Sequence, residues 1–369
     1  MSSPSRNQYV PDFVTAPGAT LQETLETLGM SQVELAERTG RPTKTISEII
    51  NAKTAITTET ALQFEKVLGV PARFWMNLER NYREWLARAE ERQNLESFLP
   101  WMEQFPIKDM IRQGWIEKFS DPVQQLIELL RFFGIASPAN WEPLYAGGNI
   151  AYRQSASFTA DPGAVSAWLR AGEILAQRME CAPYDPAQFR SALVEIRTLT
   201  VQPPDQFLPA IKNLFSQAGV AVVFVHELPR LATSGATRWL TPEKAIIQLS
   251  LRYKRDDQLW FTFFHEAGHI LLHGKKAIFL EGDKAKNEQE DQADSFAADV
   301  LIPPAEYHRL QPRTGHFSAA EILRFASEIG IAPGIVVGRL QHEKRLEISH
   351  LNRLKQRLIW ANDAHSHRV

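Results

Sequence analysis

Two histidines four residues apart constrain this chain more than any other feature of its sequence. His265 and His269 enclose Glu266 in segment 261–273, whose apolar residues predict a buried helix. Residues at this spacing share one face of a helix, so both imidazoles can bind one ion. Neutral imidazole suits Zn²⁺, and a neighbouring carboxylate can take a proton from a zinc-activated water. The segment therefore predicts a catalytic zinc site with Glu266 as its base.

A catalytic zinc needs a third protein ligand and an open position for water. We expect Glu290 in this role, because Glu290 and Asp294 lie four residues apart in segment 288–300, the next predicted helix. Asp294 would accept a hydrogen bond from the distal nitrogen of a ligand histidine. Three neighbouring acids compete for either role: Glu288, Asp291 and Asp299.

His273 offers an alternative third ligand one helical turn beyond His269. A third histidine outside the same helix normally requires a glycine break between the histidines, which this sequence lacks. We therefore expect His273 to be structural. Two apolar runs, 220–225 and 245–251, predict strands ahead of the zinc helix. An extended substrate could add to the edge of the second strand.

These residues resemble the ImmA/IrrE metallopeptidase family over roughly residues 205–345. The zinc helix of that family reads like this one, including the trailing histidine, and its next helix carries a Glu-x-x-Ala-Asp/Asn-x-Phe-Ala pattern. Here that pattern runs from Glu290 to Ala297, and Pro303 follows a hydrophobic stretch. The resemblance implies three zinc ligands and one catalytic residue: His265, His269 and Glu290, with Glu266. Members often cleave repressor proteins, so a regulatory protein is the implied substrate class.

Segment 20–70 predicts short helices in quick succession. Ser31 and Glu34 have the spacing of a capping box, and Thr43 is expected to cap the helix that follows. The apolar faces of these two helices are predicted to consist of Val33, Leu35, Ala36, Ile46, Ile49 and Ile50. This is the arrangement of a helix-turn-helix, whose second helix reads a DNA major groove.

The outward residues of this second helix suit contacts with base edges and phosphates. The candidate DNA-binding residues are Arg41, Thr43, Lys44, Thr45, Ser47, Glu48, Asn51 and Lys53, with Arg38 at the flank. Residues 1–92 nevertheless carry 11 basic and 12 acidic residues, so this region is not basic overall. A helical domain that binds protein instead of DNA is the alternative.

Residues 31–51 resemble the Cro/CI-type helix-turn-helix, and the continuation to Leu78 is similar to the HigA branch of antitoxins. That branch implies a homodimer on operator DNA, autoregulation, and an mRNA-cleaving toxin as a possible partner. Relatives commonly carry glycine after the asparagine, but this chain has Ala52 after Asn51. The difference concerns the turn and not the fold.

The whole pattern predicts a mainly α protein with a small α+β region. We expect an N-terminal arm, an all-α helix-turn-helix domain, a helical connecting region, a zincin-like metallopeptidase domain with a short sheet, and a helical tail. The boundaries are 1–18, 19–92, 93–204, 205–345 and 346–369. Cys181 is the single cysteine, the first residues lack the apolar core of a signal peptide, and the formal charge is −2. A cytoplasmic protein without a membrane span is expected.

Several other residues have less specific signals. His226 is more typical of a structural histidine than of a cleft residue. One of four residues could stabilise an oxyanion: Tyr253, Tyr307, His308 or His316. Basic residues near the C-terminus are typical of a solvated face, although they could hold DNA or another subunit: Lys344, Arg345, Arg353, Lys355 and Arg357.

Three functional hypotheses remain open at this level. The preferred one is a DNA-binding transcriptional regulator whose zinc-dependent endopeptidase cleaves a regulatory protein or the chain itself. The second is a HigA-type antitoxin or repressor without catalysis, whose zinc domain senses or binds a toxin. The third is a peptidase whose N-terminal helices bind only protein.

Overall fold

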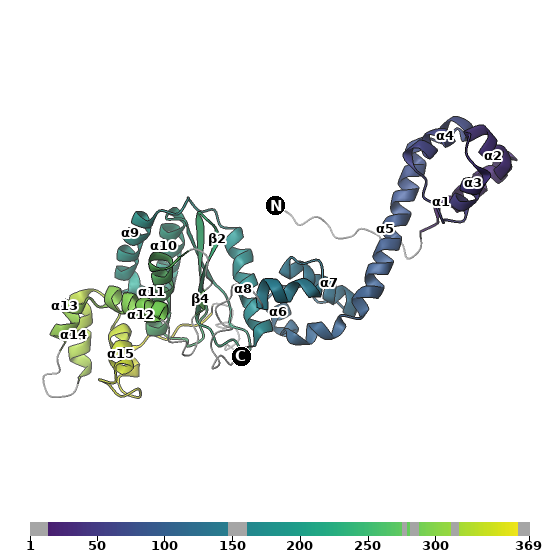
Figure 1. Ribbon diagram of the computed structural model, residues 1–369. Coiled ribbons are helices and arrows are strands. Elements are labelled where there is room, and N and C mark those ends of the chain that lie inside the picture. Colours follow the sequence, from purple (N-terminus) through teal and green to yellow (C-terminus); the bar gives the residue numbers. More distant parts are fainter. Residues whose placement is uncertain (1–13, 147–160, 275–278, 281–287, 311–316, 361–369) are drawn as a thin grey trace. The chain divides into compact units, whose positions relative to one another are not determined.

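The computed structural model describes residues 14–146, 161–274, 279–280, 288–310 and 317–360. The chain forms two compact units, residues 1–98 and 99–369 (Figure 1). None of the described helices is both long enough and apolar enough to cross a membrane.

The first unit is entirely helical. Its helices are α1 (Pro17–Leu28), α2 (Gln32–Thr39), α3 (Thr43–Ile50), α4 (Thr58–Leu68) and α5 (Ala72–Glu96). Leu21, Leu35, Ile46, Phe64 and Trp75 are fully buried and form the centre of its core. Each of the first four helices contributes an apolar stripe to this core, which is why such short helices are stable together.

Three local expectations for this unit need correction. The Ser31 hydroxyl accepts from the Glu34 amide at 3.1 Å, but the Glu34 side chain pairs with Arg38 instead of completing a capping box. Pro42 occupies the N-cap of α3, so Thr43 is its first residue and caps nothing. Val33 is 53% exposed and does not belong to the core.

The second unit contains the remaining helices and the sheet. Its α-helices are α6 (Ile107–Arg112), α7 (Pro122–Phe133), α8 (Pro162–Gln177), α9 (Pro186–Thr198), α10 (Pro204–Gln217), α11 (Asp256–Leu272), α12 (Glu288–Leu301), α13 (Pro304–Arg309), α14 (Ala319–Ile329) and α15 (Pro333–His342). Short helical turns are η1 (Leu99–Gln104), η2 (Pro138–Asn140), η3 (Glu142–Ala146), η5 (Leu199–Val201) and η6 (Asn352–Leu354). The strands are β1 (Val220–Phe224), β2 (Gly235–Thr241), β3 (Lys244–Leu249) and β4 (Phe279–Leu280).

The sheet has the strand order β1-β3-β2-β4. β3 pairs in parallel with β1, Val222 opposite Ile247, and antiparallel with β2, Thr237 opposite Ile247. The predicted strand 245–251 is therefore central, and an added peptide cannot reach an edge of it. The prediction was wrong because β2, which covers that edge, has no recognisable strand pattern in the sequence. The mainly α fold class with a small sheet is confirmed.

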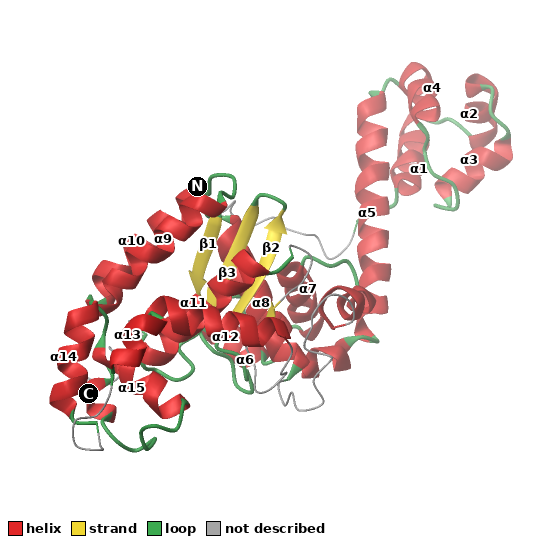
Figure 2. Ribbon diagram, turned by 60° about the vertical axis from the view of Figure 1, so that its left-hand side comes forward, coloured by secondary structure: helices red, strands yellow, loops and turns green. Residues whose placement is uncertain are grey.

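Each face of the sheet packs against a different group of helices (Figures 1 and 2). Val220 and Val222 of β1 point into a core shared with α9, α10 and α11, whereas Ala221 and Val223 point into a core shared with α7 and α8. This alternation follows from the two-residue period of a strand. Buried on both faces, the sheet provides a rigid base for α11.

Polar side chains of the sheet bind the carboxyl half of α8. The Gln248 amide donates to the Trp168 carbonyl at 2.6 Å, and the Lys244 ammonium donates to the Ala176 carbonyl at 2.8 Å. Gly172 lies against Gln248, so that a Cβ there would come within 1.9 Å of the Gln248 Oε1. The segment predicted to connect two domains thus contributes a helix to the second unit.

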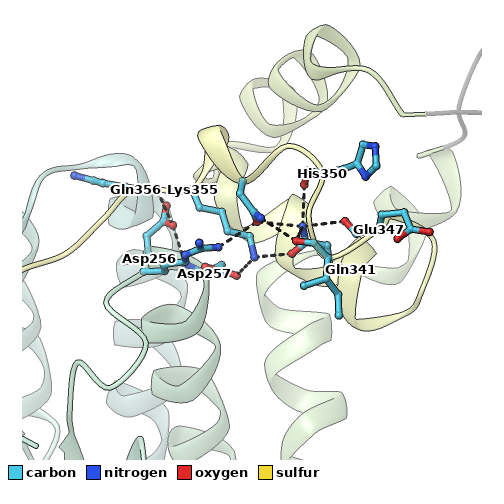
Figure 3. Close-up of polar contacts among 10 residues, drawn as sticks. Asp256, Asp257, Gln341, Glu347, His350, Lys355 and Gln356 are labelled. Carbon is cyan, nitrogen blue, oxygen red and sulfur yellow. Dashed lines mark hydrogen bonds and ion pairs between the residues drawn. The ribbon is translucent and has the colours of Figure 1, made fainter.

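The described part of the predicted helical tail 346–369, residues 346–360, does not form an α-helix. It consists of turns, including η6, and an extended stretch in which Arg357 bridges Arg255. Figure 3 shows that this stretch contacts the first residues of α11, where Asp256 accepts from the Gln356 amide at 2.9 Å. These backbone bonds replace the bonds of a helix, which explains the irregular conformation.

Candidate functional site

Three ligand atoms predicted from the sequence converge between α11 and α12. The Nε2 atoms of His265 and His269 lie 3.0 Å apart. The Glu290 carboxylate is 3.2 Å from the Nε2 of His265 and 3.5 Å from that of His269. Both imidazoles are about 2% exposed. His265, His269 and Glu290 form the group of described residues that could hold a metal ion.

The separations among these atoms fit zinc. Donors arranged tetrahedrally at about 2.0–2.1 Å from the ion lie roughly 3.3–3.4 Å from each other. The three observed separations bracket that value, and two imidazoles with one carboxylate are a typical donor set for a catalytic zinc. The residues present therefore fit the ion that the sequence predicts.

Small residues bring the two helices close enough for this geometry. A Cβ on Gly268 would lie 3.3 Å from the Cα of Ala293 and 3.1 Å from the ring of Phe296. Ala293 and Ala297 are completely buried at the same contact. Because no larger side chain separates the helices, Glu290 on α12 reaches the histidines of α11.

Asp294 holds the first ligand histidine. Its carboxylate lies 2.8 Å from the Nδ1 of His265, which leaves Nε2 directed at Glu290 and His269. Such a contact fixes the tautomer and the orientation of a ligand imidazole. The structure thus brings Asp294 to the position expected from the sequence.

His273 holds the second ligand histidine, a role that the sequence interpretation missed. Its Nδ1 lies 2.9 Å from the Nδ1 of His269, and its Nε2 lies 3.1 Å from the side-chain oxygen Oε1 of Gln292. The Gln292 amide in turn donates to Glu288 at 3.2 Å. If His269 binds an ion through Nε2, its Nδ1 donates to His273, and the remaining hydrogen bonds have one consistent direction.

Glu266 lies on the sheet side of α11 and is completely buried. A Cβ on Gly235, the first residue of β2, would lie 2.6 Å from the Glu266 Oε1 and 2.6 Å from the Thr262 methyl. The Thr237 hydroxyl donates to the Glu266 carbonyl at 3.1 Å. The start of β2 therefore fixes Glu266, and neither residue of β2 had a signal in the sequence.

Burial and contacts set the charge state of this site. Burial lowers the pKa of His269, which favours the neutral imidazole that a metal requires. Burial works to raise the pKa of Glu290, but the contacts with His265 and His269 outweigh it and lower the pKa to about 2. Glu290 is thus a carboxylate at ordinary pH, beside the His269 imidazole, whose neutral form burial favours.

The competing acids lie elsewhere on α12. Glu288, Asp291 and Asp299 are exposed and line a hollow on its outer face together with Leu272. Glu288 contacts the site only indirectly, through Gln292.

The other candidate residues are dispersed. His226 stacks on Trp360, with ring centroids 3.9 Å apart. The Tyr307 hydroxyl donates to Glu343, and burial raises the pKa of this tyrosine. Tyr253 is 46% exposed and His308 is exposed on α13, while His316 lies outside the described residues.

In the first unit, α2 and α3 are joined by a turn at Gly40, which has a φ of 67°. Ile46 and Ile49 of α3 are buried, and Thr43 and Lys44 are exposed on the opposite side. The exposed set continues past the helix end with Asn51 and Lys53; Thr45, Ser47 and Glu48 are half-buried.

Several of the candidate DNA-binding residues have partners within the unit, among them Lys44 and Asn51. Arg41 donates to Gln63 and lies 3.5 Å from Glu59. Glu48 lies 3.8 Å from the Lys44 ammonium. The face that α3 presents thus carries short hydroxyl and amide side chains with one exposed lysine.

Known proteins match the chain in two separate stretches. The Helix-turn-helix family matches residues 21–75, and the peptidase family described as IrrE N-terminal-like domain matches residues 220–341. Virulence-associated protein A of Dichelobacter nodosus is 40% identical over 68 residues, which are 18% of this chain and 67% of that protein. The uncharacterized HTH-type transcriptional regulator YddM of Escherichia coli (strain K12) is 33% identical over 75 residues, 20% of this chain and 78% of that protein.

A solved structure also resembles part of the chain. It is an addiction module antidote protein of a HigA family from Coxiella burnetii, with 33% sequence identity and a TM-score of 0.21. The similarity covers 22% of this chain and 91% of that one.

Proposed function

We propose that the chain is a DNA-binding regulator with a zinc-dependent endopeptidase. The proposal is supported by the match of residues 21–75 to the helix-turn-helix family and of residues 220–341 to the IrrE N-terminal-like peptidase domain. The substrate is a regulatory protein or the chain itself. One observation carries the enzymatic part: His265, His269 and Glu290 converge in one place, and the buried Glu266 directly follows His265 in the sequence.

Each residue of the site has a distinct part in the proposed hydrolysis. His265, His269 and Glu290 would hold zinc, which supplies Lewis acidity for the scissile carbonyl and for the attacking water. Glu266 takes the proton from that water and passes it to the leaving nitrogen. Asp294 keeps the His265 ring in the orientation that directs Nε2 at the site.

The DNA-binding part of the proposal is carried by the surface of α3. Its N-terminal residues Thr43, Lys44, Thr45 and Ser47 contact base edges, while Arg41 and Lys53 contact phosphates. Glu48 and Asn51 complete the candidate set. Since one such helix covers a half-site, we propose a homodimer on operator DNA. A toxin partner follows only from the similarity of residues 31–78 to the HigA branch.

Metal content and proteolysis together test the enzymatic part. We expect about one zinc per purified wild-type chain, little in Glu290→Ala, and an unchanged amount in Glu266→Gln. New protein amino termini should appear in cells that express the wild type and be absent with Glu266→Gln. Selection of bound sequences from a random duplex pool tests DNA binding, and Lys44→Ala should weaken it.

A catalytically inactive antitoxin or repressor is the second candidate, because both named relatives align with only 18–20% of this chain. Zinc binding with identical amino termini in wild-type and Glu266→Gln cells would favour it. A chain that folds but takes up no zinc would remove the peptidase altogether.

A further inference from the structure

A small surface depression, which we call the groove, lies beside the first turns of α11; it encloses only about 10 Å³, so a peptide would lie over it. Thr262, Leu259 and Gln258 line it from the helix, and Ser234 and Ser250 line it from the sheet. Thr262 and Glu266 both lie against Gly235, so the inner end of the groove adjoins the proposed catalytic carboxylate.

The outer end of the groove is basic. Arg252, Lys254 and Arg255 line it, and its lining includes no Asp or Glu. Arg357 lies beside Arg255 through a backbone bridge. Both arginine side chains are exposed, while Arg252 and Lys254 are half-buried. We call Arg252, Lys254, Arg255 and Arg357 the basic cluster.

The nearest carboxylates do not neutralise this cluster. Asp256 and Asp257 are each 3% exposed and face inward. Asp257 pairs with Lys355 at 2.5 Å, and Asp256 accepts backbone amides (Figure 3). The salt bridges among the described residues include none made by the four members of the cluster. Their charge is therefore available to a ligand.

The cluster is held rigidly rather than presented on a free tail. The Leu358 amide donates to the Lys254 carbonyl at 2.9 Å, and Leu358 itself is 5% exposed. The Arg255 guanidinium donates to the Asn352 side chain at 3.1 Å. Charges fixed in this way select a partner at a small cost in side-chain entropy.

We propose that the basic cluster binds an acidic segment of the substrate protein, which lies over the groove on one side of the scissile bond. The inference rests on the proposed peptidase function. Arg255 precedes Glu266 by eleven helical positions, on the order of 16 Å. An extended peptide advances about 3.3 Å per residue, so the cluster lies about five residues from the scissile bond. Asp or Glu at that distance is the predicted determinant of specificity.

The basic cluster lies at the end of the groove and does not run along the face of a helix. This position favours a peptide over DNA as its ligand. Nucleic acid remains an outcome of the test.

The binding test uses the full-length chain with Glu266→Gln, loaded with zinc. The probes are fluorescein-labelled twelve-residue oligoglutamate, a Gly-Ser peptide of equal length, and a duplex of random sequence. Arg255→Gln/Arg357→Gln is compared with Arg178→Gln/Arg190→Gln, which removes the same charge from exposed positions on and near α8 and α9. We expect the chain to bind oligoglutamate at low salt. The affinity should fall about fivefold or more in Arg255→Gln/Arg357→Gln and stay unchanged in Arg178→Gln/Arg190→Gln.

The cleavage test uses active enzyme and a peptide library made from a digested proteome. We expect Asp and Glu to be enriched about five residues from the cut, and this enrichment to disappear in Arg255→Gln/Arg357→Gln. Equal oligoglutamate binding by both double variants would overturn the inference. So would a cluster variant that binds the DNA duplex more weakly but binds oligoglutamate as well as before. Absence of any cleavage, with oligoglutamate binding still dependent on the cluster, would instead overturn the peptidase function.

Discussion

Gly235 and Glu266 lie in direct contact although 31 positions separate them in the sequence. A Cβ added to Gly235 would come within 2.6 Å of the Glu266 Oε1 and 2.8 Å of its Cγ. The first residue of β2 therefore fixes the place of the carboxylate that we propose as the catalytic base, while the proposed zinc ligands His265 and His269 lie on the adjoining face of the helix, towards α12.

Gly235→Ala should displace Glu266 without removing the metal. We expect kcat for peptide cleavage to fall at least about tenfold, because a base moved by about 1 Å loses its alignment with the attacking water. Zinc content should stay at the wild-type value. Gly274→Ala is the matched control, since a Cβ at Gly274 has nothing within 4 Å. Loss of zinc in Gly235→Ala would show that the contact supports the ligands and not the base.

His273 should strengthen zinc binding through His269. We expect His273→Phe to weaken zinc affinity by about 10-fold, because a ring without an acceptor cannot hold the Nδ1 proton of His269. Competition with a chromophoric chelator measures this change, which requires no activity.

The variant His273→Asn separates positioning from packing. Its side-chain oxygen can accept the same hydrogen bond, so it should recover most of the affinity. His308→Phe changes an exposed histidine of α13 and should leave affinity unchanged. Equal affinities for His273→Phe and wild type would assign His273 a purely structural role.

Local patterns predicted most of the helices and the central residues of the site. The spacing of His265 and His269 depends only on helical geometry, and the predicted helix 288–300 matches α12 to within one residue. Glu290 and Asp294 could be named because they share one face of a predicted helix.

Contacts between distant segments could not be predicted from such patterns. β2 begins with Gly-Ala-Thr, which lacks the β-branched run of β1, so its presence depends on pairing with β3. The role of His273 depends on Gln292 of another helix. The C-terminal segment has amphipathic character, but its backbone bonds to Lys254 and Asp256 override the helix.

Lys355→Met should destabilise the second unit strongly. Asp257 is 2% exposed at its side chain and pairs with Lys355 at 2.5 Å, so the substitution leaves a buried carboxylate without its cation. We expect the free energy of unfolding to fall by about 3–5 kcal/mol. Denaturant unfolding of the second unit measures this loss. Arg353→Met, an exposed change two residues away, should cost less than about 0.5 kcal/mol.

Asp256 should make stability depend on pH in the opposite sense to an ordinary ion pair. Burial raises the pKa of Asp256 from 3.8 to about 6, and the charge of Asp257 adds to this, against several backbone hydrogen bonds. Because the folded state binds the proton more tightly, the stabilisation is fully present below the usual pKa and is lost as pH rises through about 6. The change is of order 2–3 kcal/mol.

Asp256→Asn should remove this dependence, since its oxygen can still accept the Gln356 amide. Unfolding of wild type and Asp256→Asn at several pH values between 4 and 7 measures the difference. A constant difference across this range would show that Asp256 does not take up a proton on folding. The lowered pKa of Glu290 acts only below pH 4.5 and with the reverse sign, so it does not interfere.

Ala52→Gly should stabilise the first unit at the end of the proposed DNA-reading helix. Ala52 has a φ of 56°, a left-handed conformation in which an L side chain costs roughly 1–2 kcal/mol. The amide of Lys53 donates to the Glu48 carbonyl at 2.8 Å, so the bonds that end α3 hold Ala52 in this conformation. Glycine removes the strain but loses more entropy on folding, which leaves a gain of about 0.5–1 kcal/mol in the free energy of unfolding.

Hydrogen exchange of the buried amides of α2–α4 should slow by about two- to fivefold in Ala52→Gly, whereas Ala55→Gly in the same loop should accelerate it. Equal or faster exchange in Ala52→Gly would mean that the turn relaxes at no cost, and the departure from the glycine of its relatives would then be neutral.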